Sequence, residues 1–103
     1  MSFILVYVTY PNMKEANEIV SHLLQKKLIA CANFFPVKSS FWWEGKIDNS
    51  EEIVSICKTK KENWEKIKSE IKKMHSYETP CILKIDAEVN EDFEDWVKKE
   101  TES

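Results

Sequence analysis

The sequence contains no arginine: all 15 of its basic side chains are lysines, and the formal net charge is −3. A lysine ammonium is a point charge and cannot hold a phosphate or a carboxylate through the two parallel N–H bonds of a guanidinium. Enzymes that grip phosphate with arginine, such as acylphosphatases, are therefore disfavoured. The excess of negative charge also argues against nucleic acid as a partner, and residues 52–58 lack the basic and aromatic motif of an RNA-recognition domain.

Cysteine and glycine are scarce as well. The three cysteines, Cys31, Cys57 and Cys81, are widely spaced and form neither a CxxC metal pair nor a disulfide framework. We therefore expect reduced, mostly buried thiols and exclude a metallochaperone with a CxxC site. The first apolar run, residues 3–10, is too short for a membrane span and no basic leader precedes it. These features predict a cytoplasmic protein with no membrane partner.

What the chain does contain is a dense aromatic ribbon over residues 29–47, in which Phe41, Trp42 and Trp43 follow one another. Neighbouring residues of a strand point to opposite faces, so one side of one sheet cannot bury both tryptophans. A chain of this length builds a single domain, residues 1–103, with one modest core. We therefore expect a second copy of the protein to cover part of the ribbon. The alternative is an ordinary central strand with helices on one face and a loop on the other.

The first third of the chain predicts a strand and a helix. Residues 3–10 are continuously apolar, which is typical of a central strand that is covered on both faces. Asn12 and Glu15 have the spacing of a capping box, and the apolar stripe that follows predicts a helix to about residue 27. Within the ribbon, Pro36 marks a sheet edge or a bulge, and residues 48–50 predict the turn that ends it.

A second strand-and-helix pair follows. Residues 52–58 alternate as a strand, which places Lys58 on an otherwise apolar face. Thr59 and Glu62 have the spacing of a capping box for a helix that ends near Met74. A partly buried ammonium needs an anionic partner. For Lys58 that partner could be Glu78, Glu52 or a bound ligand, and we choose Glu78 of the same or a neighbouring subunit.

The last third predicts a strand over residues 81–89, half-exposed because apolar and polar side chains alternate, and a short helix around Phe93, Trp96 and Val97. The order is therefore β-α-β-β-α-β with an additional C-terminal helix. In this order two βαβ-type crossovers are joined by a long hairpin. The arrangement predicts an α+β fold, the ferredoxin-like sandwich, in which the first and third strands are central.

The corner at residues 75–80 carries the chemistry that the sequence offers. His75 brings an imidazole that binds metals or transfers protons near neutral pH, Glu78 a carboxylate and Tyr77 a phenol. Met74 adds a thioether, which favours copper over zinc. The competing interpretation is structural: a histidine at a helix end commonly caps the last carbonyls, and the other side chains order a turn before a proline. We find no nucleophile paired with a base, which predicts that the protein is not an enzyme.

Five stretches carry a resemblance to a known family. They occur in chain order and are Val8-Thr9-Tyr10-Pro11, then Leu28-Ile29-Ala30-Cys31-Ala32-Asn33, then Ser40-Phe41-Trp42-Trp43-Glu44-Gly45-Lys46-Ile47, then Glu52 with Lys58-Thr59, and finally His75-Ser76-Tyr77-Glu78-Thr79-Pro80. The tryptophan-Glu-Gly segment and the His-x-Tyr-Glu-x-Pro corner are the most specific. Over nearly its whole length the sequence resembles the CutA divalent-cation tolerance proteins.

The resemblance implies a ferredoxin-like protomer in an interlocked homotrimer, in which long hairpins complete sheets between subunits. It also implies a cytosolic protein linked to tolerance of copper and other divalent metals, with metal held by a cysteine after the first strand and by histidines of the corner. Here Val8 occupies the cysteine position and Met74 that of a paired histidine, so only His75 remains of that set. Ser76 stands where the family usually has proline, which we expect to loosen the corner.

Two hypotheses of different class follow. In the first, a homotrimer with Phe41, Trp42 and Trp43 in its interface binds copper or another divalent cation through His75, assisted by Met74 and Glu78. In the second, the trimer is a sensor that resembles the PII signalling proteins and binds a small anion between subunits, in a cleft formed by Lys58, Tyr77, Glu78 and Trp43. Neither hypothesis requires a resident cofactor.

Overall fold

Strand β1 runs through the middle of the sheet, as its continuous apolar pattern predicts. The computed structural model describes residues 3–102. Over these residues the elements in chain order are β1 (Phe3–Tyr10), α1 (Met13–Gln25), β2 (Cys31–Trp43), β3 (Lys46–Lys60), the 3-10 turn η1 (Lys61–Asn63), α2 (Trp64–Met74), β4 (Ile82–Asp86) and α3 (Glu91–Glu100).

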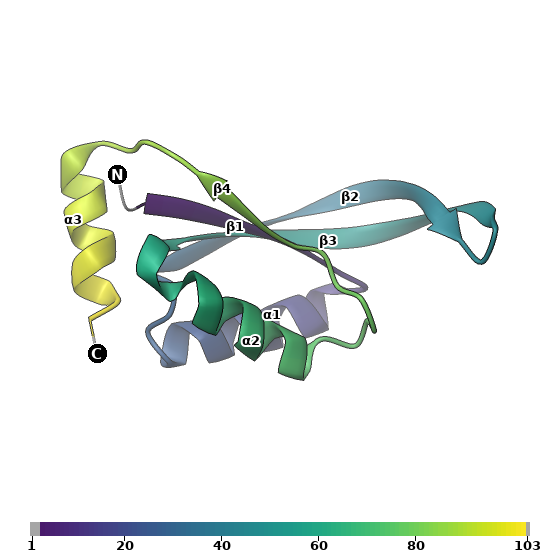
Figure 1. Cartoon of the computed structure of the whole chain (residues 1–103), viewed down its shortest axis with the longest axis horizontal. Helices are drawn as coiled ribbons and strands as arrows, with labels where there is room; N and C mark the ends of the chain where they lie inside the picture. The colour runs from purple at the N-terminus through teal and green to yellow at the C-terminus, as the bar shows by residue number, and fades with distance from the viewer. Residues whose placement is uncertain (1–2, 103) are drawn as a thin grey trace.

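The four strands form one antiparallel sheet in the order β2-β3-β1-β4. Strands β1 and β3 are thus central, as the sequence predicts, and the fold is of the α+β class. Helices α1 and α2 lie side by side against one face of this sheet, and α3 packs across the end far from the hairpin tip (Figure 1). Among residues 3–102, no strand pairs with the outer edge of β2 or of β4.

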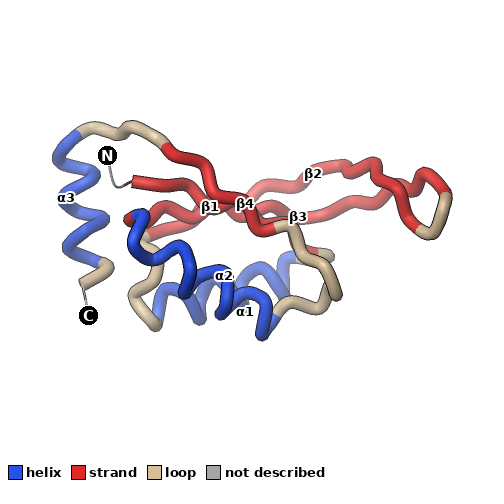
Figure 2. Tube along the Cα trace, viewed as in Figure 1, coloured by secondary structure: helices blue, strands red, loops and turns tan. Residues whose placement is uncertain are grey.

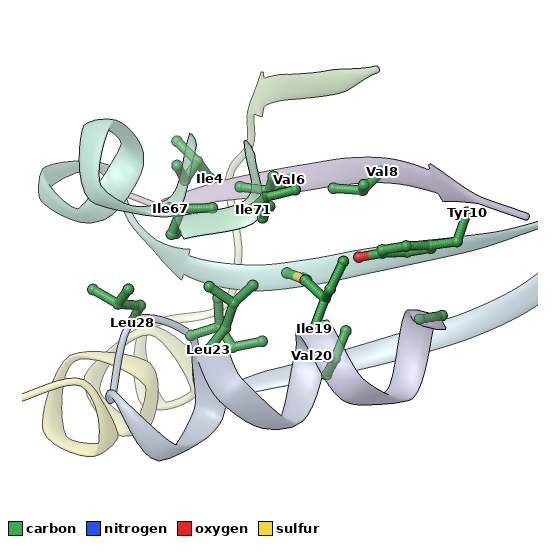
Figure 3. Packing of buried hydrophobic residues seen from close by; sticks show 13 residues of the cluster. Ile4, Val6, Val8, Tyr10, Ile19, Val20, Leu23, Leu28, Ile67 and Ile71 are labelled. Atoms are coloured by element: carbon green, nitrogen blue, oxygen red, sulfur yellow. The ribbon is translucent and has the colours of Figure 1, made fainter. Parts of the chain in front are cut away.

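The core lies between the sheet and the two helices (Figure 3). From β1, alternate residues point toward the helices, and Ile4, Val6, Val8 and Tyr10 have no exposed surface. A fully buried side chain of this size contributes about 1.5–3 kcal/mol to folding. The apolar stripes of α1 and α2, which the sequence spacing predicts, pack against these side chains and include Ile19, Leu23, Ile67 and Ile71.

The opposite face of the sheet, which we call the open face, is also apolar. Register places Leu5, Tyr7, Phe35, Ile56, Leu83 and Ile85 on it. Neither α1 nor α2 covers these side chains, and Leu83 and Ile85 remain 46% and 41% exposed. Within β4 the predicted alternation is therefore present, but its apolar side, Leu83 and Ile85, faces away from the core. The regular strand is also shorter than predicted, since β4 ends at Asp86.

The β2–β3 hairpin projects beyond the helices and makes the molecule elongated, with extents of 45 × 24 × 21 Å (Figures 1 and 2). Its turn is at Glu44 and Gly45, whose φ angles are +50° and +80°. Two residues with positive φ match the right-handed twist of a hairpin. The prediction of a turn at residues 48–50 is wrong: these residues continue β3, and Asn49 accepts a hydrogen bond from Ser40 across the ladder.

Two further predictions about helix and strand ends can be judged. Asn12 caps α1 by accepting a hydrogen bond from the Glu15 amide at 2.9 Å, as predicted. Thr59 does not cap α2, because β3 continues to Lys60 and the Thr59 hydroxyl donates to the Leu28 carbonyl at 2.6 Å. Pro36 lies in the edge strand β2 without a bulge, since the register with β3 is regular. No helix within residues 3–102 has the length and apolar character needed to cross a membrane.

Candidate functional site

The imidazole of His75 is the centre of a buried polar network at the end of α2. Its side chain is fully buried, and its Nε2 lies 2.7 Å from the carbonyl oxygen of Thr9 in β1. A carbonyl can only accept, so Nε2 carries a proton and donates it. Its Nδ1 accepts the backbone N–H of Tyr77 at 3.1 Å. These partners assign the neutral imidazole with its proton on Nε2 and both ring nitrogens engaged.

Aromatic rings hold the imidazole on two sides. It stacks on Tyr10 with the ring centroids 5.4 Å apart and the planes at 10°, and it contacts Tyr77 at 4.8 Å. Tyr10 is itself fixed, because its hydroxyl shares a 2.8 Å hydrogen bond with Ser55 inside the core. Burial raises the pKa of Tyr10 well above its usual value, so this phenol stays protonated. The ring of His75 is thus positioned by packing as well as by hydrogen bonds.

Glu15 of α1 joins the same network, which the sequence did not indicate. The capping-box spacing predicts that its carboxylate turns back to the helix start; instead Oε2 accepts the Ser76 backbone N–H at 3.0 Å and lies 3.3 Å from Nδ1 of His75. A proline at position 76 would have no N–H to donate. Ser76 therefore does not simply loosen the corner, because its N–H provides an additional attachment to α1.

Tyr77 connects the network to β3. Its hydroxyl donates to Oε2 of Glu52 at 2.6 Å, and the pKa of Tyr77 is raised by partial burial and by this carboxylate. Glu52 is half-buried and lies beyond the point where β1 ends. The corner at residues 75–80 thereby reaches α1 through Glu15, β1 through Thr9 and β3 through Glu52. We call these contacts of His75, Ser76 and Tyr77 the corner network.

As a metal site this corner offers little in the conformation described. A histidine ligand needs a free nitrogen lone pair, and both nitrogens of His75 are already bonded. Met74 is 39% exposed and Glu78 is exposed, so their thioether and carboxylate face solvent while the imidazole is buried. No cluster of three or more His, Cys, Asp or Glu side chains suited to a metal occurs within residues 3–102. The closed corner does not fit a metal held by His75.

Lys58 lies far from the corner. Its ammonium sits over the ring of Phe93 in α3, 5.6 Å from the centroid. Lys58 is six positions after Glu52 in β3, which is about 20 Å of strand, and Glu52 is the residue that accepts the Tyr77 hydroxyl. Among the residues that the structure describes, Lys58 forms no ion pair. Within one chain, the predicted pairing of Lys58 with Glu78 is therefore wrong.

The aromatic residues of the hairpin form a third, separate region. Trp42 and Trp43 are 73% and 60% exposed, and Phe41 is 37% exposed. Trp42 pairs across the ladder with Ile47 and Trp43 pairs with Lys46, so the two indoles lie on opposite faces of the ribbon. One chain covers neither face, and it does not bring Trp43 close to Tyr77 or Lys58. A cleft that contains all of them would require residues from different subunits.

A groove next to the corner network was not predicted. It has a volume of about 450 Å³ and lies between the start of α1 and the base of the hairpin, lined by residues 11–13, 36–38 and 51–53. Its charged side chains are Glu51, Glu52 and Lys38, so carboxylates outnumber ammonium groups. Glu52 thus faces the groove and also accepts the Tyr77 hydroxyl. The sequence gives only a faint signal for this groove, the strand break at Pro11.

A second charged cluster connects the two helices on their outer side. Glu70 of α2 is 2.7 Å from Nε2 of His22, 3.1 Å from Nζ of Lys73 and 3.3 Å from Nζ of Lys26. Hydrogen bonds from these three groups lower the pKa of Glu70 to about 2. Because the carboxylate already has three cationic or polar partners, we interpret the cluster as an attachment between α1 and α2.

All three cysteines are free thiols, as expected. A mostly buried set was also expected, but only Cys57 is buried, whereas Cys31 is half-buried and Cys81 is exposed. Burial raises the pKa of the Cys57 thiol to about 11, and it raises the pKa of Cys31 as well. A thiol nucleophile acts as the thiolate, so neither thiol is activated at neutral pH.

Comparison with known proteins gives a consistent result. The sequence model of the family described as "CutA1 divalent ion tolerance protein" matches residues 4–100. The divalent-cation tolerance protein CutA of Archaeoglobus fulgidus is 47% identical over 98 residues, which is 94% of this chain and 96% of that protein. The CutA protein of Pyrococcus horikoshii is 43% identical over 99 residues, 95% of this chain and 97% of that protein.

Solved structures agree. The structure of the periplasmic divalent cation tolerance protein CutA from Archaeoglobus fulgidus superposes with a TM-score of 0.95 at 46% identity, covering 97% of this chain and 99% of that one. The structure of CutA1 from Oryza sativa gives 0.94 at 30% identity, covering 99% and 95%. By the family match and by these identities over nearly its full length, the chain belongs to the CutA1 divalent ion tolerance family.

Proposed function

We propose that the protein acts in tolerance of divalent cations, copper among them, as a cytoplasmic homotrimer of ferredoxin-like protomers that binds metal and is not an enzyme. Membership of the divalent ion tolerance family supports the metal-related role. The observation that carries the trimer is the open face: its central part is apolar and half-exposed, and α1 and α2 cover only the other side of the sheet.

A second copy of the chain is the occupant that best fits this surface. Half-exposed aliphatic and aromatic side chains run from β4 across β1 and β3 to β2, and the tryptophans extend the same character to the hairpin tip. Such a continuous apolar surface is typical of an interface. The unpaired edges of β2 and β4 also suit strand pairing between copies. In the trimer we place Phe41, Trp42 and Trp43 in the interface.

Two exposed side chains of the corner support the proposed metal binding. Met74 and Glu78 face solvent and offer one soft and one hard donor, a pair that suits weak to moderate binding of copper. His75 can complete the set only if the corner opens, because its nitrogens are otherwise engaged. We therefore expect binding without a resident metal cofactor, and an affinity set partly by how often residues 75–80 open.

Calorimetric titration of Cu²⁺ and Zn²⁺ tests this assignment. Wild type is expected to bind copper stoichiometrically with at least micromolar affinity, and His75→Ala and Met74→Leu are each expected to weaken it. The matched control is His22→Ala, which removes the other imidazole of the chain and should leave copper binding unchanged. Equal binding by wild type and His75→Ala, or a loss only in the control, would contradict metal binding at the corner.

A second candidate is a sensor similar to PII proteins, with a small anion bound between subunits. What favours it is the groove of about 450 Å³ beside Tyr77 and Glu52 at the base of the hairpin. Because its own carboxylates outnumber its ammonium groups, the anion requires Lys58 from another protomer, which could also add Trp43. Thermal shift with a panel of small carboxylates and phosphates would test it. A rise in melting temperature that disappears in Lys58→Met supports the sensor, and no shift with any compound counts against it.

A further inference from the structure

We propose that the hydrogen bond between the Tyr77 hydroxyl and Glu52 is a latch, which keeps residues 75–80 closed over the His75 imidazole. The His75 imidazole is accessible to dissolved molecules only when this hydrogen bond is broken. The inference is linked to the proposed metal binding because both concern the His75 imidazole. The latch itself can be tested without metal.

The attachments of the corner single out this bond. Three polar contacts hold residues 76 and 77: Ser76 N–H to Glu15, Tyr77 N–H to Nδ1 of His75, and Tyr77 hydroxyl to Glu52. The Tyr77 hydroxyl is the one of the three that reaches β3. Two of the three bonds have a carboxylate acceptor, and hydrogen bonds to a charged acceptor are about twice as strong as neutral ones. Of these two, the bond from Tyr77 to Glu52 is the shorter, at 2.6 Å against 3.0 Å for Ser76 to Glu15.

Opening the latch would uncover a nitrogen that is already positioned. When Tyr77 moves away, Nδ1 loses the backbone N–H that it accepts and the ring that lies 4.8 Å away. The other side of the imidazole stays in place, because Nε2 donates to Thr9 and the ring stacks on Tyr10. The exposed lone pair would then lie beside the Glu15 carboxylate, 3.3 Å from Nδ1. An imidazole nitrogen next to a carboxylate suits a cation.

Binding in the groove would affect the latch through Glu52. Glu52 lines the groove and accepts the Tyr77 hydroxyl, so one carboxylate serves both. A cation that binds Glu52 from the groove competes with Tyr77 for the same carboxylate and favours the open corner. A single cation-binding event could thus release the latch and expose His75.

Carbethoxylation by diethyl pyrocarbonate tests the latch, because the reagent attacks an accessible, unprotonated imidazole nitrogen. The chain has two histidines, so mass spectrometry can follow both in the same sample, and His22 serves as an internal control. In wild type we expect His75 to react more slowly than His22. Tyr77→Phe and Glu52→Gln should each accelerate His75 about ten-fold or more, the factor expected for losing a hydrogen bond to a charged group. Glu51→Gln is the matched control and should leave both rates unchanged.

The outcomes separate the latch from the metal proposal. An unchanged His75 rate in both latch variants would overturn the latch, as would an equal acceleration of His22 and His75, which indicates general loosening. Zn²⁺ titration of Tyr77→Phe, with and without His75→Ala, adds the second arm. If His75 reacts faster but Zn²⁺ binds no more tightly, the latch stands and metal binding at His75 fails.

Discussion

Both faces of the sheet carry apolar side chains, but their surroundings differ. On the helix side, Ile4, Val6 and Val8 of β1 have no exposed surface, whereas on the open face Leu83 and Ile85 of β4 are nearly half exposed. The helix side is completed by α1 and α2 of the same chain. The open face has no such cover, apart from α3 at one end, where Phe3 meets Phe93. Under the proposed trimer, the difference separates side chains that stabilise the protomer from side chains that join one protomer to another.

The largest effect should come from shortening a residue of the helix side. Ile4→Ala removes fully buried carbon atoms and is expected to lower the free energy of unfolding by about 2–5 kcal/mol, measured by urea denaturation. Ile85→Ala deletes the same atoms from the open face. If the proposed trimer forms, this substitution should lower stability only at the protein concentrations at which the chains are assembled. An equal cost for Ile85→Ala at all concentrations would show that the two faces do not differ in role.

Trp43→Asp tests whether another copy of the chain covers the hairpin. In a single chain this side chain is 60% exposed, so the substitution should hardly affect protomer folding. In the trimer it would bury an unpaired carboxylate, at a cost of several kcal/mol. We therefore expect dissociation in analytical ultracentrifugation, with Trp43→Phe as the conservative control that stays assembled. A trimer of unchanged stability would place Trp43 outside the interface.

A smaller effect is expected at the hairpin turn. Gly45 has a φ of +80°, and a Cβ added there would meet no atom within 4 Å, so the penalty of Gly45→Ala is one of backbone conformation. We expect about 1 kcal/mol of destabilisation. Glu44→Asn should instead stabilise slightly, because asparagine adopts positive φ more readily than glutamate. The melting temperatures of both variants test these two expectations. An unchanged melting temperature for Gly45→Ala would contradict the turn assignment.

The smallest effect concerns the contact between α1 and α2 and depends on pH. The pKa of Glu70 is lowered to about 2 by its hydrogen bonds to His22, Lys73 and Lys26. A lowered pKa adds stability above the usual carboxyl value of about 4.3, and the addition is lost as the pH falls toward 2. The melting temperature of Glu70→Gln should therefore lie below that of wild type near neutral pH and approach it in acid. Glu65→Gln, which removes an exposed carboxylate paired with Lys68, is the control with little expected effect at either pH.

Sequence reasoning succeeded where local pattern and burial agree. The continuous apolar run of β1 indicated a central strand, and Asn12 indicated the start of α1. It failed where side chains serve contacts across the sheet: residues 48–50 have turn chemistry, but Asn49 uses its amide oxygen to bond Ser40. In β4 the alternation was visible, but no pattern in one chain tells whether an apolar face is covered by a helix or by another copy.

The candidate site was predicted only in part, because its partners are distant in sequence. The sequence alone indicates residues 75–80, including Tyr77, as the candidate site. The acceptor of the His75 proton is 66 residues away in the sequence, and Glu15 is 61 residues from Ser76. Spacing within the corner cannot reveal such partners, which arise when α1, β1 and α2 pack together. They leave His75 with no free nitrogen, and the corner is therefore better described as a closed network than as an open metal site.

The central claim is that the open face and the hairpin are covered by copies of the same chain. Multi-angle light scattering of the purified protein at micromolar concentration tests it most directly. We predict a mass of about three times the 12.2 kDa of the chain. A mass of one chain at that concentration would contradict the trimer and leave the apolar open face without an explanation.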